Sequence, residues 1–174
     1  MAPMAENPSE KPVRAAEEEI VPAAESVLDG TAERAGVPGV LFVCVRNGGK
    51  SQMAAGLMRH ELAEAGVEGR ILVSSAGTEP GSGINSLSAE VLQEVGADIS
   101  GETPTQLTPE AMREAGLVVV LGAQAQVEAP EGVTVERWAT DEPSARGIEG
   151  RERMELIRED IHARVRKLKD RLLS

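Results

Sequence analysis

A short apolar run that ends in a glycine-rich turn sets the fold class of this chain. Residues 40–43 read Val-Leu-Phe-Val, and the turn after them contains two adjacent glycines, Gly48 and Gly49. From Ser51 to Ala65, apolar residues then recur at helical spacing. A continuous apolar run of this length is typical of a strand buried in a parallel sheet. The pattern therefore predicts a strand–loop–helix unit.

Strand and helix patterns continue to alternate along the rest of the chain. Thr108 and Pro109 have the side chains that favour the first positions of a helix. Further strands are predicted over 71–73, 117–121 and 133–135, and further helices over 87–95, from 109, and from about 150 to the end. This alternation predicts an α/β fold in three layers, with a four-stranded parallel sheet flanked by helices.

The first 38 residues differ in composition from the rest. They contain Pro3, Pro8, Pro12 and Pro22 and a run of three glutamates at 17–19. A segment of this length and composition buries too little apolar surface to fold alone. We therefore expect an acidic N-terminal extension over 1–38, flexible or partly helical, and one domain over 39–174.

Charge and cysteine content exclude several function classes. The formal net charge is −11, which repels nucleic acid, and no run of about 18 apolar residues is present to cross a membrane. The N-terminus lacks the basic and then apolar pattern of a secretion signal. The single cysteine cannot form an internal disulfide, and its chemistry requires a reducing compartment. We expect a soluble cytoplasmic protein with no nucleic-acid or membrane partner.

The turn after the first strand carries the candidate chemistry. Open α/β sheets bind ligands at this edge, and adjacent glycines let consecutive N–H groups point inward. The following helix adds its positive end, which favours a thiolate at Cys44 as a nucleophile. Alternatively, Cys44 is a small buried apolar residue. The residues expected to bind a tetrahedral oxyanion are Val45, Arg46, Asn47, Gly48, Gly49, Lys50 and Ser51, and the Ser51 hydroxyl is expected to reach the sulfur.

The loop resembles that of the low-molecular-weight protein tyrosine phosphatase family, and more closely that of its arsenate reductase branch. The resemblance rests on the spacing from Cys44 to Lys50–Ser51, the Gln-Met-Ala that follows, and further segments at 75–78, 85, 95–100 and 138. It covers residues 39–174. The segment 47–53 and Leu121-Gly122, where thioredoxin-linked relatives carry a cysteine, are similar to single-cysteine arsenate–mycothiol transferases.

The resemblance implies arsenate detoxification without a bound cofactor or metal. A second thiol must come from outside, because Cys44 is the only cysteine. The implied co-substrate is mycothiol, which would form an arseno–thiol conjugate that a mycoredoxin then reduces. Glutathione stays open as the thiol, and so does the question of whether Cys44 forms a covalent adduct or organises the site. Neither His60 nor His162 has partners at metal-ligand spacing.

Two positions depart from the family pattern. The family usually has Arg where this chain has Lys50. The planar guanidinium group of Arg can bind an oxyanion with two parallel hydrogen bonds, whereas the ammonium group of Lys is a compact single charge. The phosphatases have Asp before the proline of a late loop, where this chain has Glu142 preceded by Asp141. Either carboxylate is a candidate proton donor. Asn85 is expected to support the loop or to start a helix.

Two other functions remain open at this point. One is a phosphatase that hydrolyses phosphate esters through a Cys44 phospho-intermediate, and the other is an oxyanion-binding module without catalysis.

Overall fold

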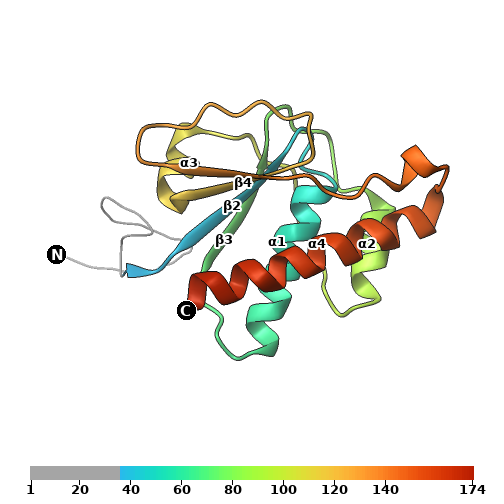
Figure 1. The fold of residues 1–174 in the computed structure, drawn as a ribbon, viewed down its shortest axis with the longest axis horizontal. Helices are drawn as coiled ribbons and strands as arrows, with labels where there is room; N and C mark the ends of the chain where they lie inside the picture. Colours follow the sequence, from blue (N-terminus) through green and yellow to red (C-terminus); the bar gives the residue numbers. More distant parts are fainter. Residues whose placement is uncertain (1–35) are drawn as a thin grey trace.

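The computed structural model describes residues 36–174. The expected N-terminal extension therefore lies, apart from its last three residues, outside the described residues, and its boundary stays a prediction. The described elements, in chain order, are β2 (Gly39–Cys44), α1 (Lys50–Glu64), β3 (Leu72–Gly77), α2 (Ser86–Gln93), α3 (Pro109–Ala115), β4 (Leu117–Leu121), β5 (Thr134–Trp138), the short 3-10 helix η2 (Pro143–Arg146) and α4 (Gly150–Leu173) (Figure 1).

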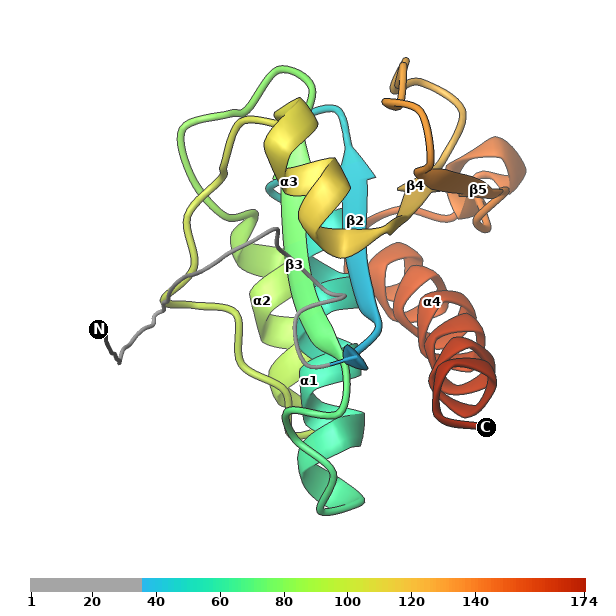
Figure 2. The same ribbon diagram turned by 90° about the vertical axis from the view of Figure 1, so that its left-hand side faces the viewer.

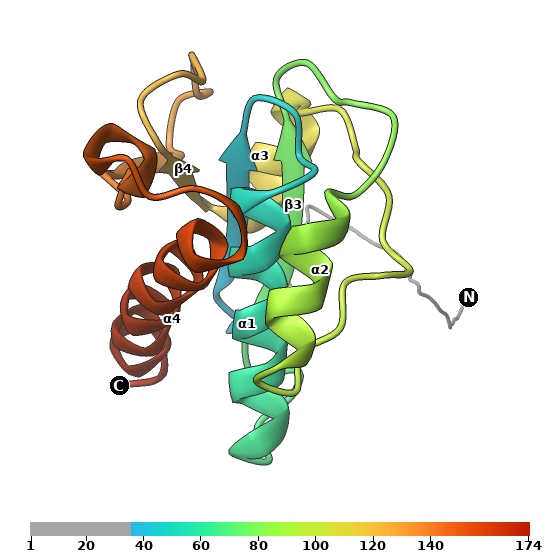
Figure 3. The same ribbon diagram turned by 90° about the vertical axis from the view of Figure 1, so that its right-hand side faces the viewer.

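The four strands form one parallel sheet in the order β3-β2-β4-β5. Helix α3 covers one face (Figure 2), and α1 packs directly on the other, with α2 and α4 packed against α1 on that side (Figure 3). The predicted three-layer fold with a four-stranded parallel sheet is confirmed. Parallel strands end at the same edge, so the turn after β2 lies at the carboxyl edge of a central strand.

Strand β2 is buried on both faces, which explains its continuous apolar run. Val40 and Phe42 pack against the helices of one face, whereas Leu41 and Val43 pack toward α3 on the other. Successive side chains of a strand point to opposite faces, so both sets must be apolar. This double burial fixes the position of Cys44, the last residue of the strand.

Strand β5 extends further than its sequence pattern indicates. The predicted strand covers 133–135, whereas the observed strand runs to Trp138 and includes Glu136 and Arg137. These two residues carry charged side chains because β5 is an edge strand, where solvent accommodates them. Trp138 is buried and packs on Phe42, with ring centroids 5.7 Å apart.

The predicted helix starts lie close to the observed ones. The Thr108 hydroxyl accepts a hydrogen bond of 3.1 Å from the Ala111 N–H, and Pro109 is the first residue of α3. Over residues 36–174, none of the helices has the length and apolar character that crossing a membrane requires.

Candidate active site

The candidate site is the loop between β2 and α1. Strand β2 ends at Cys44 and α1 begins at Lys50, so the loop joins the carboxyl end of a buried strand to a helix N-terminus. Gly49 occupies the N-cap position, and no side chain caps the helix. The N–H groups of the first turn are therefore left for another acceptor, which is the arrangement of an anion-binding helix start.

Cys44 lies among hydrogen-bond donors of this loop. Its half-buried sulfur is 2.9 Å from the Ser51 Oγ atom and accepts a hydrogen bond of 3.3 Å from the Asn47 N–H. The structure thus places the predicted nucleophile and Ser51 in contact. The sulfur of Cys44 therefore has hydrogen-bonding neighbours and not apolar neighbours alone.

Asn47 determines which way the Ser51 hydroxyl points. The Asn47 Oδ1 atom accepts from the Thr105 backbone N–H at 2.9 Å, which identifies the other amide atom as the donor Nδ2. Nδ2 donates to Ser51 Oγ at 2.8 Å. Because Ser51 accepts this hydrogen bond, its own hydroxyl proton is available for the sulfur of Cys44.

Asn47 is fully buried and has a φ of 56°, the left-handed conformation that Asn tolerates better than most residues. The sequence assigned Asn47 to the oxyanion loop without predicting its buried side-chain network. The sequence does indicate the left-handed backbone conformation, since an Asn beside two glycines in a tight loop is typical of a residue with positive φ.

Gln52 is a second residue whose role the sequence did not reveal. Its side chain is almost fully buried, and its Nε2 atom donates to the Asn47 carbonyl and to the Asn47 Oδ1 atom, both at 3.2 Å. It also reaches the Thr103 carbonyl at 3.3 Å. Gln52 therefore links the loop to the segment that precedes α3. In sequence it resembles an ordinary polar helix residue.

The segment after β3 lies directly against the loop. An added Cβ at Gly77 would come within 2.6 Å of the Val45 carbonyl oxygen, so only glycine permits this close approach. Four backbone hydrogen bonds then join the two segments, from the N–H groups of Thr78, Glu79, Gly81 and Asn85 to the carbonyls of Cys44, Val45, Arg46 and Gly48. These bonds hold the loop rigid on one flank.

Asn85 contacts the loop through its backbone and not through its side chain. Its N–H donates to the Gly48 carbonyl at 2.7 Å. Its Oδ1 atom accepts from the Ser88 N–H at 2.8 Å and from the Ser88 hydroxyl at 3.1 Å, so it caps α2. Of the two roles considered for the side chain, the geometry shows the helix-start role.

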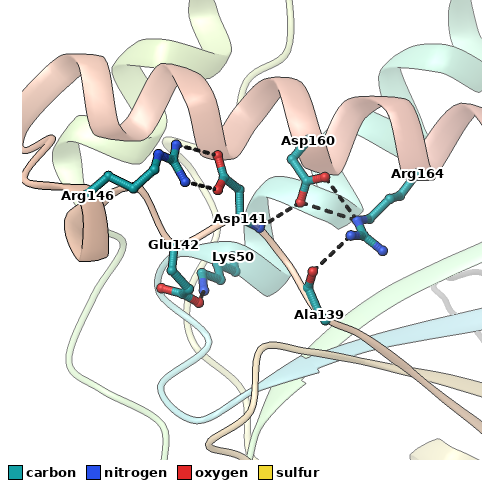
Figure 4. Close-up of polar contacts among 7 residues, drawn as sticks. All are labelled: Lys50, Ala139, Asp141, Glu142, Arg146, Asp160 and Arg164. Carbon is teal, nitrogen blue, oxygen red and sulfur yellow. Dashed lines mark hydrogen bonds and ion pairs between the residues drawn. The ribbon is translucent and has the colours of Figure 1, made fainter.

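Lys50 and Glu142 form an ion pair beside the loop, with Lys50 Nζ 2.6 Å from Glu142 Oε2 (Figure 4). The side chain of Lys50 is 21% exposed and that of Glu142 is 51% exposed. The structure therefore brings two predicted site residues together, although the ammonium group contacts a carboxylate. Arg46 is exposed, and its guanidinium makes one long hydrogen bond, 3.5 Å to the Glu79 carbonyl.

Asp141 is held by different partners from those of Glu142. Arg146 donates to both of its carboxylate oxygens, at 2.8 and 3.2 Å (Figure 4). These hydrogen bonds hold the pKa of Asp141 below its usual value. The backbone N–H of Asp141 donates to Asp160 on α4 at 2.9 Å, which fixes this loop to the helix. Asp141 is thereby kept ionised, which does not suit a proton donor.

No group of three or more His, Cys, Asp or Glu side chains among residues 36–174 could hold a metal ion. His162 contacts Glu61 at 2.7 Å between α1 and α4, away from the loop. The candidate site contains a cysteine, a serine, an ion pair and backbone donors.

The sequence of this chain is similar to a described family and to curated relatives. A model of the family described as low molecular weight phosphotyrosine protein phosphatase matches residues 39–173. A putative arsenate reductase of Halobacterium salinarum is 31% identical over 124 residues, which are 71% of this chain and 85% of that one. An arsenate reductase of Staphylococcus aureus is 32% identical over 135 residues, covering 76% of this chain and 96% of its own.

A solved structure supports the same relationship. The thioredoxin-dependent arsenate reductase of Corynebacterium glutamicum superposes with a TM-score of 0.64 at 32% identity. The match covers 79% of this chain and 62% of that chain, so this protein spans less than two thirds of it. The family match over nearly all described residues, with relatives above 30% identity, shows that this chain belongs to the low molecular weight phosphotyrosine protein phosphatase family.

Proposed function

We propose that this protein is an arsenate reductase with Cys44 as its nucleophile. One observation carries the proposal: the only cysteine of the chain lies 2.9 Å from Ser51 Oγ and accepts a hydrogen bond from the Asn47 N–H, in a loop that leads into an uncapped helix start. The names of the relatives support arsenate as the oxyanion. Backbone N–H groups of the loop, Lys50 and Ser51 would hold the arsenate oxygens.

In the first step, the Cys44 sulfur attacks arsenic. An arsenic–sulfur bond forms, one arsenic–oxygen bond breaks, and the departing oxygen leaves as water after receiving a proton. We assign the role of proton donor to Glu142, because its side chain contacts Lys50 beside the loop, whereas Arg146 binds both carboxylate oxygens of Asp141. Lys50 lies beside Glu142 and would offset negative charge on the arsenate oxygens.

The electrons for reduction must come from outside the chain. Converting arsenic(V) to arsenic(III) takes two electrons, and Cys44 has no second cysteine to form a disulfide with. We propose that a low-molecular-weight thiol, mycothiol, attacks arsenic and displaces Cys44, which returns as a free thiolate. A mycoredoxin thiolate then attacks the mycothiol sulfur. A mixed disulfide forms, and arsenite leaves with the electron pair of the arsenic–sulfur bond.

The alternative activity, hydrolysis of phosphate esters, would use the same nucleophile. It is less well supported, because Lys50 replaces the planar guanidinium fork that binds a transferring phosphoryl group with two hydrogen bonds. The chain also has no tyrosine, and both Phe42 and Trp138, its one phenylalanine and its one tryptophan, are buried. The site therefore lacks the aromatic platform that an aryl phosphate would stack on.

The test compares two reactions of the same preparation. Arsenate-dependent NADPH oxidation is measured with mycothiol, mycoredoxin and its reductase, and hydrolysis of para-nitrophenyl phosphate is measured without arsenate. We expect NADPH oxidation that requires arsenate and is lost in Cys44→Ser. Hydrolysis of the aryl phosphate that requires Cys44, without any arsenate-dependent oxidation, would show that the protein is a phosphatase. A parallel assay with glutathione and glutaredoxin identifies the thiol.

A further inference from the structure

A surface pocket of about 510 Å³ lies on the flank of the Cys44–Ser51 loop. Its walls are segment 81–85, which precedes α2, and the first two turns of α4. Gly48, Gly49 and Lys50 of the loop line it between these walls. Neither Cys44 nor Asp141 nor Glu142 lines the pocket, so it is separate from the reacting groups while sharing their loop.

The pocket is positively charged in a strongly acidic protein. Its lining includes three cations, Arg46, Lys50 and Arg153, and no Asp or Glu side chain. The chain as a whole has a formal net charge of −11. A concave surface that gathers cations against this background attracts a ligand rich in oxygen acceptors.

Arg153 has hydrogen-bonding capacity that the protein does not use. Its Nε atom is buried without a hydrogen-bond partner, and its Nη1 atom meets only the Met154 sulfur, a weak acceptor, at 3.6 Å. Within residues 36–174, no carboxylate lies within 4 Å of Arg153 or Arg46. A buried donor without a partner is costly, so an acceptor supplied by a ligand would be favourable.

The neighbouring arginines of α4 show that this lack of partners is local. Arg151 pairs with Glu90 and Glu94 of the α2 region, and Arg158 pairs with Glu94 and Glu159. The arginine that lines the pocket lies between these two in sequence and has no such partner among the described residues. The helix therefore presents satisfied guanidinium groups toward α2 and an unsatisfied one at the pocket.

The other lining residues suit a small organic molecule. Ile84 and Met154 provide apolar surface, and the exposed Ser82 provides a hydroxyl group. Apolar walls with a few directional polar groups are typical of small-molecule sites. A bare inorganic anion would leave the apolar surface uncovered.

We propose that this pocket binds the body of the low-molecular-weight thiol that takes arsenic from Cys44. Arg153 and Arg46 bind oxygen acceptors of the thiol compound, and its aliphatic part contacts Ile84 and Met154. Because the pocket and Cys44 share one loop, a thiol compound bound in the pocket would hold its sulfur close to arsenic on Cys44. This assignment rests on the proposed function. The acceptors are hydroxyls in a sugar thiol such as mycothiol and carboxylates in a peptide thiol such as glutathione.

The test measures binding without chemistry. S-methyl mycothiol and S-methyl glutathione, which cannot attack arsenic, are titrated by calorimetry into the wild-type protein, Arg153→Gln, Gly83→Leu and Arg113→Gln. Gly83 lines the pocket, and a Cβ there would meet no atom within 4 Å, so Gly83→Leu obstructs the pocket without disturbing the fold. Arg113 is an exposed arginine of α3 and controls for the loss of one positive charge.

We expect one of the two compounds to bind, with affinity reduced at least tenfold by Arg153→Gln and by Gly83→Leu and unchanged by Arg113→Gln. Equal affinity in all four proteins, or no binding of either compound, would overturn the pocket assignment. Because no arsenate is present, these outcomes are independent of turnover. If arsenate-dependent turnover is observed and Arg153→Gln binds the compound as tightly as the wild type, the proposed function stands and only the assignment of the pocket is contradicted.

Discussion

The ammonium group of Lys50 lies 2.6 Å from Oε2 of Glu142, a residue 92 positions further along the chain (Figure 4). The contact joins the first residue of α1 to the residue that precedes η2. Exposed ion pairs of this kind contribute at most about 1 kcal/mol to stability. The main effect of this pair is positional, since it places the side chains of Lys50 and Glu142 beside the Cys44 loop.

Replacing Lys50 tests its role as the cation for the oxyanion. We expect Lys50→Ala to lower kcat/KM for arsenate by a factor on the order of 100, because one charged donor to the oxyanion is lost. Lys50→Arg keeps the positive charge and provides a planar guanidinium group that can donate two hydrogen bonds to one oxyanion. This variant should therefore retain activity and bind inorganic phosphate more tightly. Initial rates and inhibition by phosphate measure both. A rate for Lys50→Ala equal to that of the wild type would exclude Lys50 from the anion site.

The two neighbouring carboxylates should respond differently to neutralisation. Glu142→Gln removes the assigned proton donor and is expected to lower kcat by about 100-fold or more. Asp141→Asn removes a group that Arg146 already keeps ionised, so we expect less than about a fivefold change, small beside a catalytic proton transfer. Single-turnover rates at neutral pH measure the effect. A larger loss in Asp141→Asn than in Glu142→Gln would reverse the assignment.

Asn47 is expected to be a main source of local stability. Its side chain hydrogen-bonds to Ser51, Gln52 and Thr105 in a fully buried site. Asn47→Ala should lower the free energy of unfolding by at least about 2 kcal/mol, because buried partners lose their hydrogen bonds. Asn47→Gly relieves the backbone strain of Ala at positive φ while still losing the amide. Urea denaturation measures both, and a loss below about 0.5 kcal/mol, typical of surface substitutions, would contradict the network.

Glu61 should make stability depend on pH in the acid range. Burial alone would raise its pKa, but the hydrogen bond with His162 and the charges of Arg166 and Lys169 outweigh burial and lower it. A lowered carboxyl pKa stabilises the fold above the unfolded value of about 4.3, and this contribution is lost as the pH falls through the folded pKa.

The variant Glu61→Gln should therefore be less stable than the wild type at pH 7 and lose less stability on acidification. Glu64→Gln serves as the control, since Glu64 is an exposed residue of the same helix. Thermal unfolding from pH 7 to pH 3 provides the measurement. Parallel curves for Glu61→Gln and the wild type would rule out the linkage.

Much of the fold follows from local patterns in the sequence. Strand β2 and the loop after it are recognisable because double burial requires a continuous apolar run and the tight turn requires small residues. The end of β5 is not recognisable, since Glu136 and Arg137 are charged residues of an edge strand. The contact between Cys44 and Ser51 is predictable because both residues belong to one short loop.

The partners of Lys50 and Asp141 depend on contacts between distant segments. The loop that carries Asp141 and Glu142 is positioned by α4, where Asp160 accepts from the Asp141 N–H and Arg164 donates to the Ala139 carbonyl (Figure 4). Nothing near residues 139–142 in the sequence indicates these contacts. The sequence therefore names both carboxylates without separating their roles, and our proposed assignment of Glu142 rests on the hydrogen bonds that Arg146 donates to Asp141.

The central claim is that Cys44 reduces arsenate with electrons from an external thiol. The most direct measurement is the arsenite formed from arsenate in the presence of mycothiol and mycoredoxin, separated by ion chromatography and quantified by mass spectrometry, for the wild type and Cys44→Ser. We predict that arsenite accumulates with the wild-type protein, requires the added thiol and falls to the enzyme-free background in Cys44→Ser. Arsenite formation at the same rate by Cys44→Ser, or by the wild type without any thiol, would contradict this account.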